Sequence, residues 1–437
     1  MKMSCAPGGW RVDSEAGVDI ERFLGGMFRT GTLEVTLPGG KRLRLGDGSE
    51  PHLAVRLSGA TTLAQIMAKP SLGVAEAYMD HRLEFERGTI HDLVFLAGRN
   101  NGGPRAYKRP GVLKRVWKAL TDEHNARHAA RSNVHRHYDL SVDLYRAFLD
   151  DDLQYSCAYF ARDDMSLEEA QVAKKRHIAA KLALEPGQRV LDIGCGWGGM
   201  ALSLAQAARV QVLGITLSDE QLATDEARAE AAGLAERCAF RLTDYRDVTG
   251  KFDRIVSVGM FEHVGRPNYQ AFFDTVAERL TDDGVALVHS IGRFAGPSTT
   301  DPFTAKYIFP GGYIPAVSEV LPAVERAGLM VTDLEILRLH YAKTLHCWYD
   351  RFQARRAEMA ALYDERFCRM WEFYLAGAEM GFVWGDHMNF QLQVAKRNDA
   401  LPLTRDYMAE AERAPADVES RQGANDRRLE AMRASGD

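Results

Sequence analysis

The chain has 437 residues, of which 46% are hydrophobic and 26% charged, which is the composition of an ordinary globular protein. At roughly 150 residues per domain, this length suggests two or three domains. The 55 basic and 60 acidic residues leave a net charge of −5, which does not favour a nucleic-acid partner. The six cysteines contain no C-x-x-C pair, so we predict neither a disulfide framework nor a metal site.

The N-terminal stretch predicts a small α+β unit. Apolar and polar residues alternate in three short runs, which indicates strands over 33–37, 43–45 and 53–57, with the first two joined as a hairpin. Two helices are expected to follow, over 61–69 and 71–80. The stretch from Gly98 to Pro110 is rich in Gly, Pro, Asn and Arg, which predicts a linker.

A basic segment comes next. Between Arg99 and Arg136 the chain has ten Lys or Arg against two acids, although its overall charge is negative. Leu113, Val116 and Trp117 share one helical face within this segment. Two interpretations remain open: a solvated helix that packs on its neighbour, or a helix that faces an anionic lipid surface.

From Ala161 onward the chain predicts an α/β fold with a parallel sheet covered by helices on both faces, because near-continuous apolar strands alternate with helices. The predicted strands are 190–193, 210–215, 239–242, 252–258 and 285–291, and the predicted helices include 199–208 and 220–232. Alternation from Phe390 to Ala395 indicates a final antiparallel strand. The tail from Thr404 has six Arg and eight acids, which predicts a solvated helix or disorder.

A glycine-rich loop, Asp192 to Gly199, follows the first of these strands. Gly194, Gly196 and Gly199 fit the dinucleotide motif G-x-G-x-x-G, whereas Gly194, Gly196 and Gly198 fit the G-x-G-x-G form typical of S-adenosylmethionine (SAM) sites. The carboxylate of Asp192 suits a ligand ammonium and would repel a pyrophosphate. The end of the next strand, 214–218, also lacks the acid that a dinucleotide site places on the ribose. These features favour SAM, with a dinucleotide or a purely structural turn as alternatives.

Further polar residues fall beside the predicted strand ends, where ligands bind in open α/β sheets. Glu262 and His289 follow or end neighbouring strands and can therefore share a pocket. Each candidate also has a structural interpretation. Cys157 is explained as a small buried side chain, Glu262 as a helix cap, and His289 and Tyr341 as core residues.

Several motifs together resemble the cyclopropane-fatty-acyl-phospholipid synthases and mycolic acid cyclopropane synthases. They are Tyr155-Ser156-Cys157-Ala158-Tyr159, the loop 191–199, Thr216-Leu217-Ser218, Asp244-Tyr245-Arg246-Asp247, 252–265, His289-Ser290-Ile291-Gly292, 307–312 and 341–345. The similarity extends over residues 130–397, and it implies a Rossmann-like SAM-dependent methyltransferase fold. The stretch 71–80 also resembles the N-terminal extension of the bacterial phospholipid enzymes.

The resemblance implies that the enzyme adds a methylene group from SAM across the cis double bond of an unsaturated phospholipid acyl chain. The alkene attacks the sulfonium methyl, and the resulting carbocation loses a proton as the cyclopropane ring closes. The family is thought to use a bound bicarbonate ion as the base, held by side chains matching Cys157, Glu262, His289 and Tyr341 and by backbone matching Ile291. With Asp192 and Gly198 from the loop, the expected SAM-binding residues are Tyr155, Ser156, Asp192, Gly194, Gly196, Gly198, Thr216, Ser218, Gln221, Asp244 and Tyr245.

The expected organisation is an N-terminal α+β domain over 1–98, a basic linker or helix over 99–125, a catalytic domain over 126–402 and a charged tail over 403–437. Neither a secretory signal nor a charge-free window of about 18 residues is present, so we expect a cytoplasmic protein. Its lipid substrate implies peripheral association with the inner membrane, and a homodimer is one assembly left open. Three rival functions stay open: a C-methyltransferase of the same lipids, an NAD-dependent oxidoreductase and a non-catalytic lipid-binding module.

Overall fold

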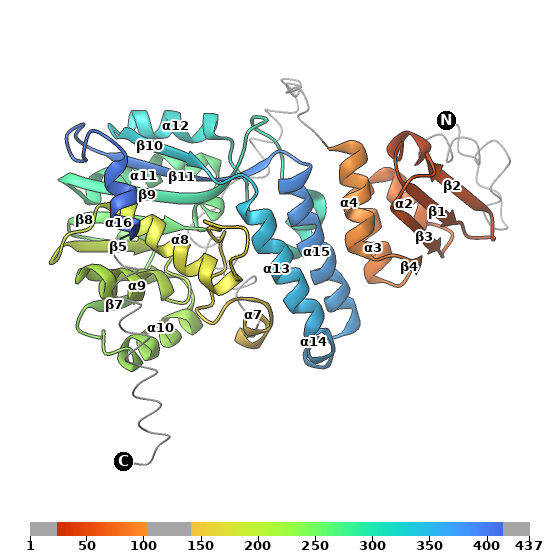
Figure 1. Ribbon diagram of the computed structural model, residues 1–437, viewed down its shortest axis with the longest axis horizontal. Coiled ribbons are helices and arrows are strands. Elements are labelled where there is room, and N and C mark those ends of the chain that lie inside the picture. Colours follow the sequence, from red (N-terminus) through yellow and green to blue (C-terminus); the bar gives the residue numbers. More distant parts are fainter. Residues whose placement is uncertain (1–23, 103–140, 414–437) are drawn as a thin grey trace, which may run out of the picture. The chain divides into compact units, whose positions relative to one another are not determined.

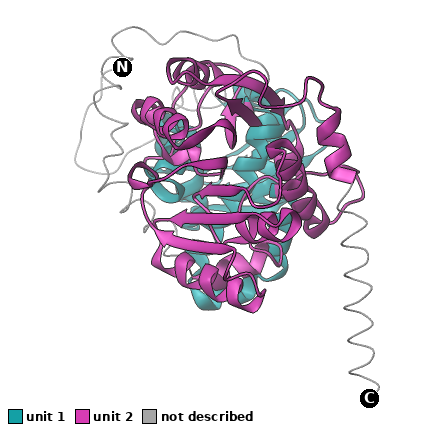
Figure 2. Cartoon of the chain, turned by 90° about the vertical axis from the view of Figure 1, so that its left-hand side faces the viewer, with its two compact units in different colours: residues 1–106, 300–310, 345–386 teal, residues 107–299, 311–344, 387–437 magenta. Residues whose placement is uncertain are grey.

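The computed structural model describes residues 24–102 and 141–413, which form two compact units (Figures 1 and 2). Within the described residues, unit 1 consists of the N-terminal segment together with 300–310 and 345–386. Unit 2 holds most of the rest, 141–299, 311–344 and 387–413. Unit 1 therefore includes two segments that lie, in sequence, inside the predicted 126–402 domain.

Unit 1 contains a four-stranded sheet with the strand order β2-β1-β3-β4. Its strands are β1 (Thr32–Thr36), β2 (Arg42–Gly46), β3 (His52–Leu57) and β4 (Leu83–Arg87). β1 and β2 pair antiparallel, which confirms the predicted hairpin, and β1 pairs parallel with β3. The strand β4 was not predicted, because its alternating pattern is short and strongly charged.

The helices of unit 1 come from both ends of the chain. They are α2 (Thr62–Ala68), α3 (Pro70–Met79), α4 (Ile90–Asn101), α14 (Arg356–Leu362), α15 (Glu365–Val383) and most of α13 (His340–Ala354). The helix α15 packs against α3 and α4, and the Tyr78 hydroxyl donates to Glu372 Oε2 (2.6 Å). This long-range packing is what assigns 345–386 to unit 1.

The predicted linker from Gly98 is wrong at its start, because α4 continues to Asn101. Gly98 lies inside the helix and allows close contact with α15: a Cβ at this position would lie 2.5 Å from Cγ of Met380. This glycine therefore serves helix packing rather than chain flexibility.

Unit 2 is built on a seven-stranded sheet with the order β10-β11-β9-β8-β5-β6-β7. Its strands are β5 (Arg189–Ile193), β6 (Gln211–Thr216), β7 (Cys238–Leu242), β8 (Phe252–Val258), β9 (Leu280–Arg293), β10 (Met330–Ile336) and β11 (His387–Ala395). The five strands from β5 to β9 are parallel, as predicted, and β11 pairs antiparallel with β9. The carboxyl ends of the parallel strands therefore meet at one edge of the sheet.

Helices cover both faces of this sheet (Figure 1). They are α7 (Val142–Phe148), α8 (Leu167–Leu182), α9 (Gly199–Ala208), α10 (Asp219–Ala231), α11 (Tyr269–Arg279), α12 (Val317–Arg326) and α16 (Asp406–Arg413). One apolar core lies under α8, α9 and α10, and the other lies under α11 and α12. These two layers confirm the α/β class with helices on both faces.

The start of the predicted tail is folded. In α16, Met408 is buried, and Glu412 pairs with Nδ1 of His177 on α8. The predicted helix is thus present over 406–413 and is mostly exposed, but one buried apolar side chain and one partly buried ion pair dock it on unit 2. Residues 414–437, and most of the basic segment, lie outside the described residues.

Candidate active site

The glycine-rich loop connects β5 to α9 through three glycines with positive φ. The φ values of Gly194, Gly196 and Gly198 are 78°, 60° and 75°, a region that side chains with a Cβ rarely adopt. A Cβ on Gly194 would lie 2.7 Å from Met260, and one on Gly198 would lie 3.0 Å from Asp225. A Cβ on Gly196 would meet no atom within 4 Å. The backbone at Gly196 therefore faces open space, where a ligand could approach it.

Asp192 lies at the end of β5, directly before this loop. The residue is 1% exposed, and its Oδ2 has no hydrogen-bond partner. Burial raises the pKa of Asp192 to about 7, although the charge of Lys174 opposes this shift. A buried acceptor without a partner costs about 1–3 kcal/mol. A cationic ligand group at this position would recover that cost.

Thr216, Ser218 and Gln221 form one hydrogen-bonded turn at the carboxyl end of β6. The Thr216 hydroxyl donates to Gln221 Oε1 (2.6 Å) and accepts from the Ser218 amide (3.1 Å). Ser218 caps α10 by accepting from the Gln221 amide. The structure therefore brings these three predicted residues together, and it places no acid at the strand end itself.

Asp244 and Tyr245 follow β7 in a short helical turn, Tyr245–Asp247. The Asp244 carboxylate caps this turn and pairs with the Arg246 guanidinium, whose Nε donates to Oδ1 (2.7 Å). The same guanidinium lies over the Tyr245 ring, 5.4 Å from its centroid. Arg246 thus neutralises the predicted acid, a pairing that the motif alone did not show.

The segment 154–157, which carries Tyr155, Ser156 and Cys157, is fastened to α8 by two buried polar side chains. Lys174 is fully buried, and its Nζ donates to Gln154 Oε1 and to Ser156 Oγ (2.9 Å). Gln171 Nε2 donates to the Ser156 carbonyl (3.0 Å). Burial lowers the pKa of Lys174 to about 8.

Sequence reasoning missed Lys174 and Gln171. One signal could have found them, because both residues occupy the same face of α8 as the buried apolar residues.

This segment also lies beside the other strand ends. A Cβ at Gly259, directly after β8, would be 3.7 Å from Cβ of Ser156. The Tyr155 ring is 5.4 Å from the ring of Tyr145 on α7. The segment therefore closes over the edge of the sheet near β8.

Cys157 is fully buried and donates its thiol proton to the Ala158 carbonyl (3.3 Å). Burial raises the pKa of this thiol, so it stays protonated and can act only as a weak donor. The neighbouring Ala158 amide donates to Thr344 Oγ1 (3.0 Å) in the first turn of α13. Tyr341, in that same turn, is buried, and the structure thereby brings its segment against the one that carries Cys157.

Glu262 lies in a single helical turn, Phe261–His263, that follows β8. Its Oε1 accepts from the Ile291 backbone amide (2.7 Å), whereas its Oε2 is buried without a partner. Burial raises the pKa of Glu262 to about 7, against the effects of the backbone amides of Ile291 and Glu262 and of the nearby Ser290 hydroxyl. The two predicted residues are thus in direct contact, and one carboxylate oxygen remains available.

His289 is 1% exposed on β9, and both of its ring nitrogens are engaged. Nε2 lies 2.9 Å from the Asn389 side-chain amide, and Nδ1 lies 3.1 Å from that of Gln391. Gln391 is the residue directly opposite His289 in the β9–β11 register. Burial holds the pKa of His289 well below its usual range, so the ring is neutral, with one donor and one acceptor nitrogen.

The two amides therefore position His289, and sequence reasoning missed both. The alternation of Gln391 with apolar residues was visible, but it did not show that both faces of β11 are buried.

The predicted residues thus gather at the carboxyl ends of β5 to β9, the edge where open α/β sheets bind ligands. Two of them, Asp192 and Glu262, are carboxylates with one buried, unpartnered oxygen each. The free oxygen of Asp192 suits a cationic ligand group beside the open backbone at Gly196, and that of Glu262 suits a proton donor.

Comparison with known proteins decides the family. Residues 125–392, more than half of the chain, match the family described as mycolic acid cyclopropane synthetase. The chain belongs to the mycolic acid cyclopropane synthetase family. Residues 20–104 match a second family, which is described only as a domain of unknown function.

Two curated relatives and one solved structure illustrate this membership. The chain is 40% identical over 330 residues to the cyclopropane-fatty-acyl-phospholipid synthase of Escherichia coli, covering 75% of this chain and 84% of that protein. It is 38% identical over 327 residues to a tuberculostearic acid methyltransferase of Mycobacterium tuberculosis, covering 72% of this chain and 76% of that protein. A mycolic acid cyclopropane synthase in complex with SAH and CTAB is 36% identical, with a TM-score of 0.58 and coverage of 60% of this chain and 97% of that one.

These likenesses confirm the predicted family and the SAM-dependent methyltransferase fold. The protein is an enzyme of the SAM-dependent methyltransferase class. The rival interpretations as an NAD-dependent oxidoreductase or a non-catalytic module are not supported.

Proposed function

We propose that this enzyme transfers a methylene group from SAM to the cis double bond of unsaturated phospholipid acyl chains and closes a cyclopropane ring. The observation that carries the proposal is the buried, unpartnered Oε2 of Glu262 at the end of β8, next to the strand that leads into the glycine loop. The reaction requires a proton to leave a carbocation inside a dry site. The Escherichia coli relative, named for this reaction, supports the assignment.

The site fits the cationic cosubstrate. Bound SAM supplies the electrophilic methyl group. The free Oδ2 of Asp192 would accept from its ammonium group, and the open backbone at Gly196 would let the ligand approach. The turn formed by Thr216, Ser218 and Gln221 would face the ribose, and Tyr245 with Asp244 would face the adenine. Tyr155 and Ser156, held by Lys174, would line the methionine end.

We further propose that a bicarbonate ion receives the proton, as the family resemblance implies. Glu262 Oε2 would accept the ion's hydroxyl hydrogen, and the Cys157 thiol and Tyr341 hydroxyl would donate to its oxygens. The Cys157 thiol, the Ile291 amide and both His289 nitrogens already have partners, namely the Ala158 carbonyl, Glu262, Asn389 and Gln391. These donors would have to give up a present partner before they could contact the ion. The proposed bicarbonate site is therefore better supported by Glu262 than by His289.

A second function is a C-methyltransferase of the same lipids, which would lose a different proton from the same cation. The similarity to the tuberculostearic acid methyltransferase favours this alternative.

Mass spectrometry of lipids from cells with and without the protein tests both functions. A gain of one CH2 per acyl chain is expected with the protein present. A product that resists hydrogenation as a ring supports the synthase, whereas an alkene or a methyl branch supports the alternative. An unchanged lipid profile contradicts both.

Asp192→Asn should weaken SAM binding and remove its dependence on pH. Because the pKa of Asp192 is about 7, wild-type affinity should rise as the pH increases through 7 and the carboxylate ionises. Loss of a charge-assisted hydrogen bond costs about 1.5–3 kcal/mol, or roughly tenfold to a hundredfold in affinity. Calorimetry between pH 6 and 8, about one unit either side of neutrality, measures both effects. A pH profile that is the same in the variant and the wild type would remove Asp192 from the site.

The lipid substrate also requires a way onto the membrane surface. Within residues 24–102 and 141–413, no helix is both long and apolar enough to cross a membrane. We propose peripheral docking through the basic segment between Arg99 and Arg136, most of which lies outside the described residues.

Reversal of Lys114, Arg115 and Lys118 to Glu should lower binding to anionic vesicles and leave SAM affinity unchanged. Each basic residue near anionic lipid contributes about 1 kcal/mol, so losing three corresponds to roughly a hundredfold in affinity. Wild-type binding should also fall as salt rises, because the attraction is screened within about 8 Å at physiological ionic strength.

The matched control for this charge reversal changes Arg209, Arg237 and Arg241, three exposed residues of unit 2, to Glu. It alters the net charge equally and should keep vesicle binding near the wild-type level. Equal binding by the first triple variant and the wild type would reject the basic segment as the docking surface.

A further inference from the structure

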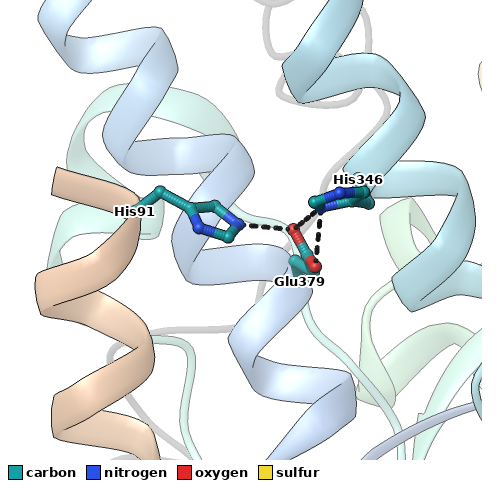
Figure 3. Close-up of side chains that lie close together, drawn as sticks. All are labelled: His91, His346 and Glu379. Carbon is teal, nitrogen blue, oxygen red and sulfur yellow. Dashed lines mark hydrogen bonds and ion pairs between the residues drawn. The ribbon is translucent and has the colours of Figure 1, made fainter. Parts of the chain in front are cut away.

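Three side chains from three helices converge in unit 1. His91 lies on α4, His346 on α13 and Glu379 on α15 (Figure 3). The two imidazoles approach the Glu379 carboxylate from opposite sides (Figure 3). Glu379 Oε2 lies 3.0 Å from His91 Nε2 and 3.4 Å from His346 Nδ1, and Oε1 lies 3.2 Å from His346 Nδ1. The proposed reaction uses none of these residues.

We propose that His91, His346 and Glu379 bind one divalent transition-metal ion of the Zn²⁺ class. Two histidines and one carboxylate are a common three-ligand set for zinc. Nitrogen ligands favour such ions over Mg²⁺ or Ca²⁺, which prefer oxygen ligands. Tetrahedral zinc places neighbouring ligand atoms about 3.3 Å apart, close to the nitrogen–oxygen distances in this cluster.

The distance between the two imidazole nitrogens is also compatible with binding one metal ion. The three ligand atoms lie within 4.8 Å of one another, so a moderate rotation of one ring would complete the set. The side chain of His346 is 51% exposed and has room to rotate, whereas that of Glu379 is 8% exposed. The exposed side would also admit water as a fourth ligand.

The surroundings orient the ligands. The His91 ring stacks on Phe95, with centroids 4.5 Å apart, and lies 4.8 Å from the Tyr349 ring. On the far side of His346, Nε2 lies 3.7 Å from Oδ2 of Asp350, one helical turn away. If a metal ion took the Nδ1 lone pair, the ring proton would lie on Nε2, where Asp350 could accept it.

His346 lies between two carboxylates, Glu379 beside Nδ1 and Asp350 beside Nε2. A neutral imidazole has a single N–H, and both nitrogens of His346 face acids. Either a proton or a cation must therefore lie between His346 and Glu379. A metal ion in that position would join α4 to α13 and α15, and would stabilise unit 1 by binding only its folded form.

The test uses the full-length protein after removal of metal with a chelator. Calorimetric titration with Zn²⁺ should give one equivalent bound per chain, and Co²⁺ should produce the absorption bands of a tetrahedral site. His346 is half-exposed, so His346→Ala should not disturb folding. It should lower Zn²⁺ affinity at least tenfold, because losing even a group that only supports a metal ligand typically costs tenfold or more. Glu379→Gln, which keeps the side-chain shape, should do the same.

The matched control is His81→Ala. His81 contacts Glu84 at 2.7 Å, also in unit 1, and forms a histidine–glutamate pair that is not part of the described three-ligand cluster. Its loss should leave the stoichiometry and affinity for Zn²⁺ unchanged, and SAM affinity should be retained by every variant. Absence of one-to-one Zn²⁺ binding in the wild type, or equal affinity in His346→Ala, would overturn the proposal and leave an ion-pair cluster only.

Discussion

Glu262→Gln is expected to cut turnover by about a hundredfold or more, the usual effect of losing one well-placed polar group, while SAM affinity stays near the wild-type level. Glutamine retains an oxygen that can accept from the Ile291 amide, so the local fold should persist. It cannot ionise, however, and so cannot hold a proton donor at the position of Oε2. Steady-state kinetics combined with calorimetry separates these two effects.

Two further measurements sharpen this test. Wild-type turnover should rise with pH through about 7, the pKa of Glu262, and the glutamine variant should lack this rise. Bicarbonate added back to depleted wild-type enzyme should restore its rate but should not rescue the variant.

Folding stability should follow the opposite trend. Because the pKa in the folded state lies above the ordinary value of 4.5, the stability contributed by the protonated Glu262 is present below pH 4.5 and is lost as the pH rises through about 7.

A buried glutamate outside the strand ends provides the control. Glu372 in unit 1 is 3% exposed, and its carboxylate oxygens already accept from Tyr78 and Arg356. Glu372→Gln should keep turnover close to that of the wild type, provided that the variant is shown to be folded. Wild-type activity in Glu262→Gln would instead assign Glu262 a purely structural role.

Gly196→Val should abolish measurable SAM binding. The φ of 60° disfavours a β-branched residue, and its side chain would extend into the open space above the loop, where the ligand is proposed to lie. Calorimetry on the folded variant measures the loss.

Gly233→Val is the control that separates the effect of backbone strain from the effect of blocking the ligand. Gly233 has a similar φ of 66° and equally open surroundings. It follows the 13-residue helix α10, about 20 Å from the helix start at Ser218. This variant should bind SAM as the wild type does, and unchanged affinity in Gly196→Val would refute the loop assignment.

The sequence by itself predicted the local elements around the site. Turn chemistry and hydrophobic periodicity act between near neighbours, so the strands β5 to β9, the loop at Gly194–Gly198 and the antiparallel strand β11 were all recognisable. The order of strand ends then indicated that Glu262 and His289 lie on neighbouring strands, which the sheet order confirms. Membership of the family was also evident from these motifs.

Only the tertiary structure decided which polar groups are partnered. Burial and hydrogen bonding depend on residues distant in the chain: His289 meets Asn389 and Gln391 across 100 and 102 positions. The same holds for His91 and Glu379, which are 288 positions apart and have no common motif. Local patterns carry no information about such pairs, because what brings them together is the packing of whole helices and strands.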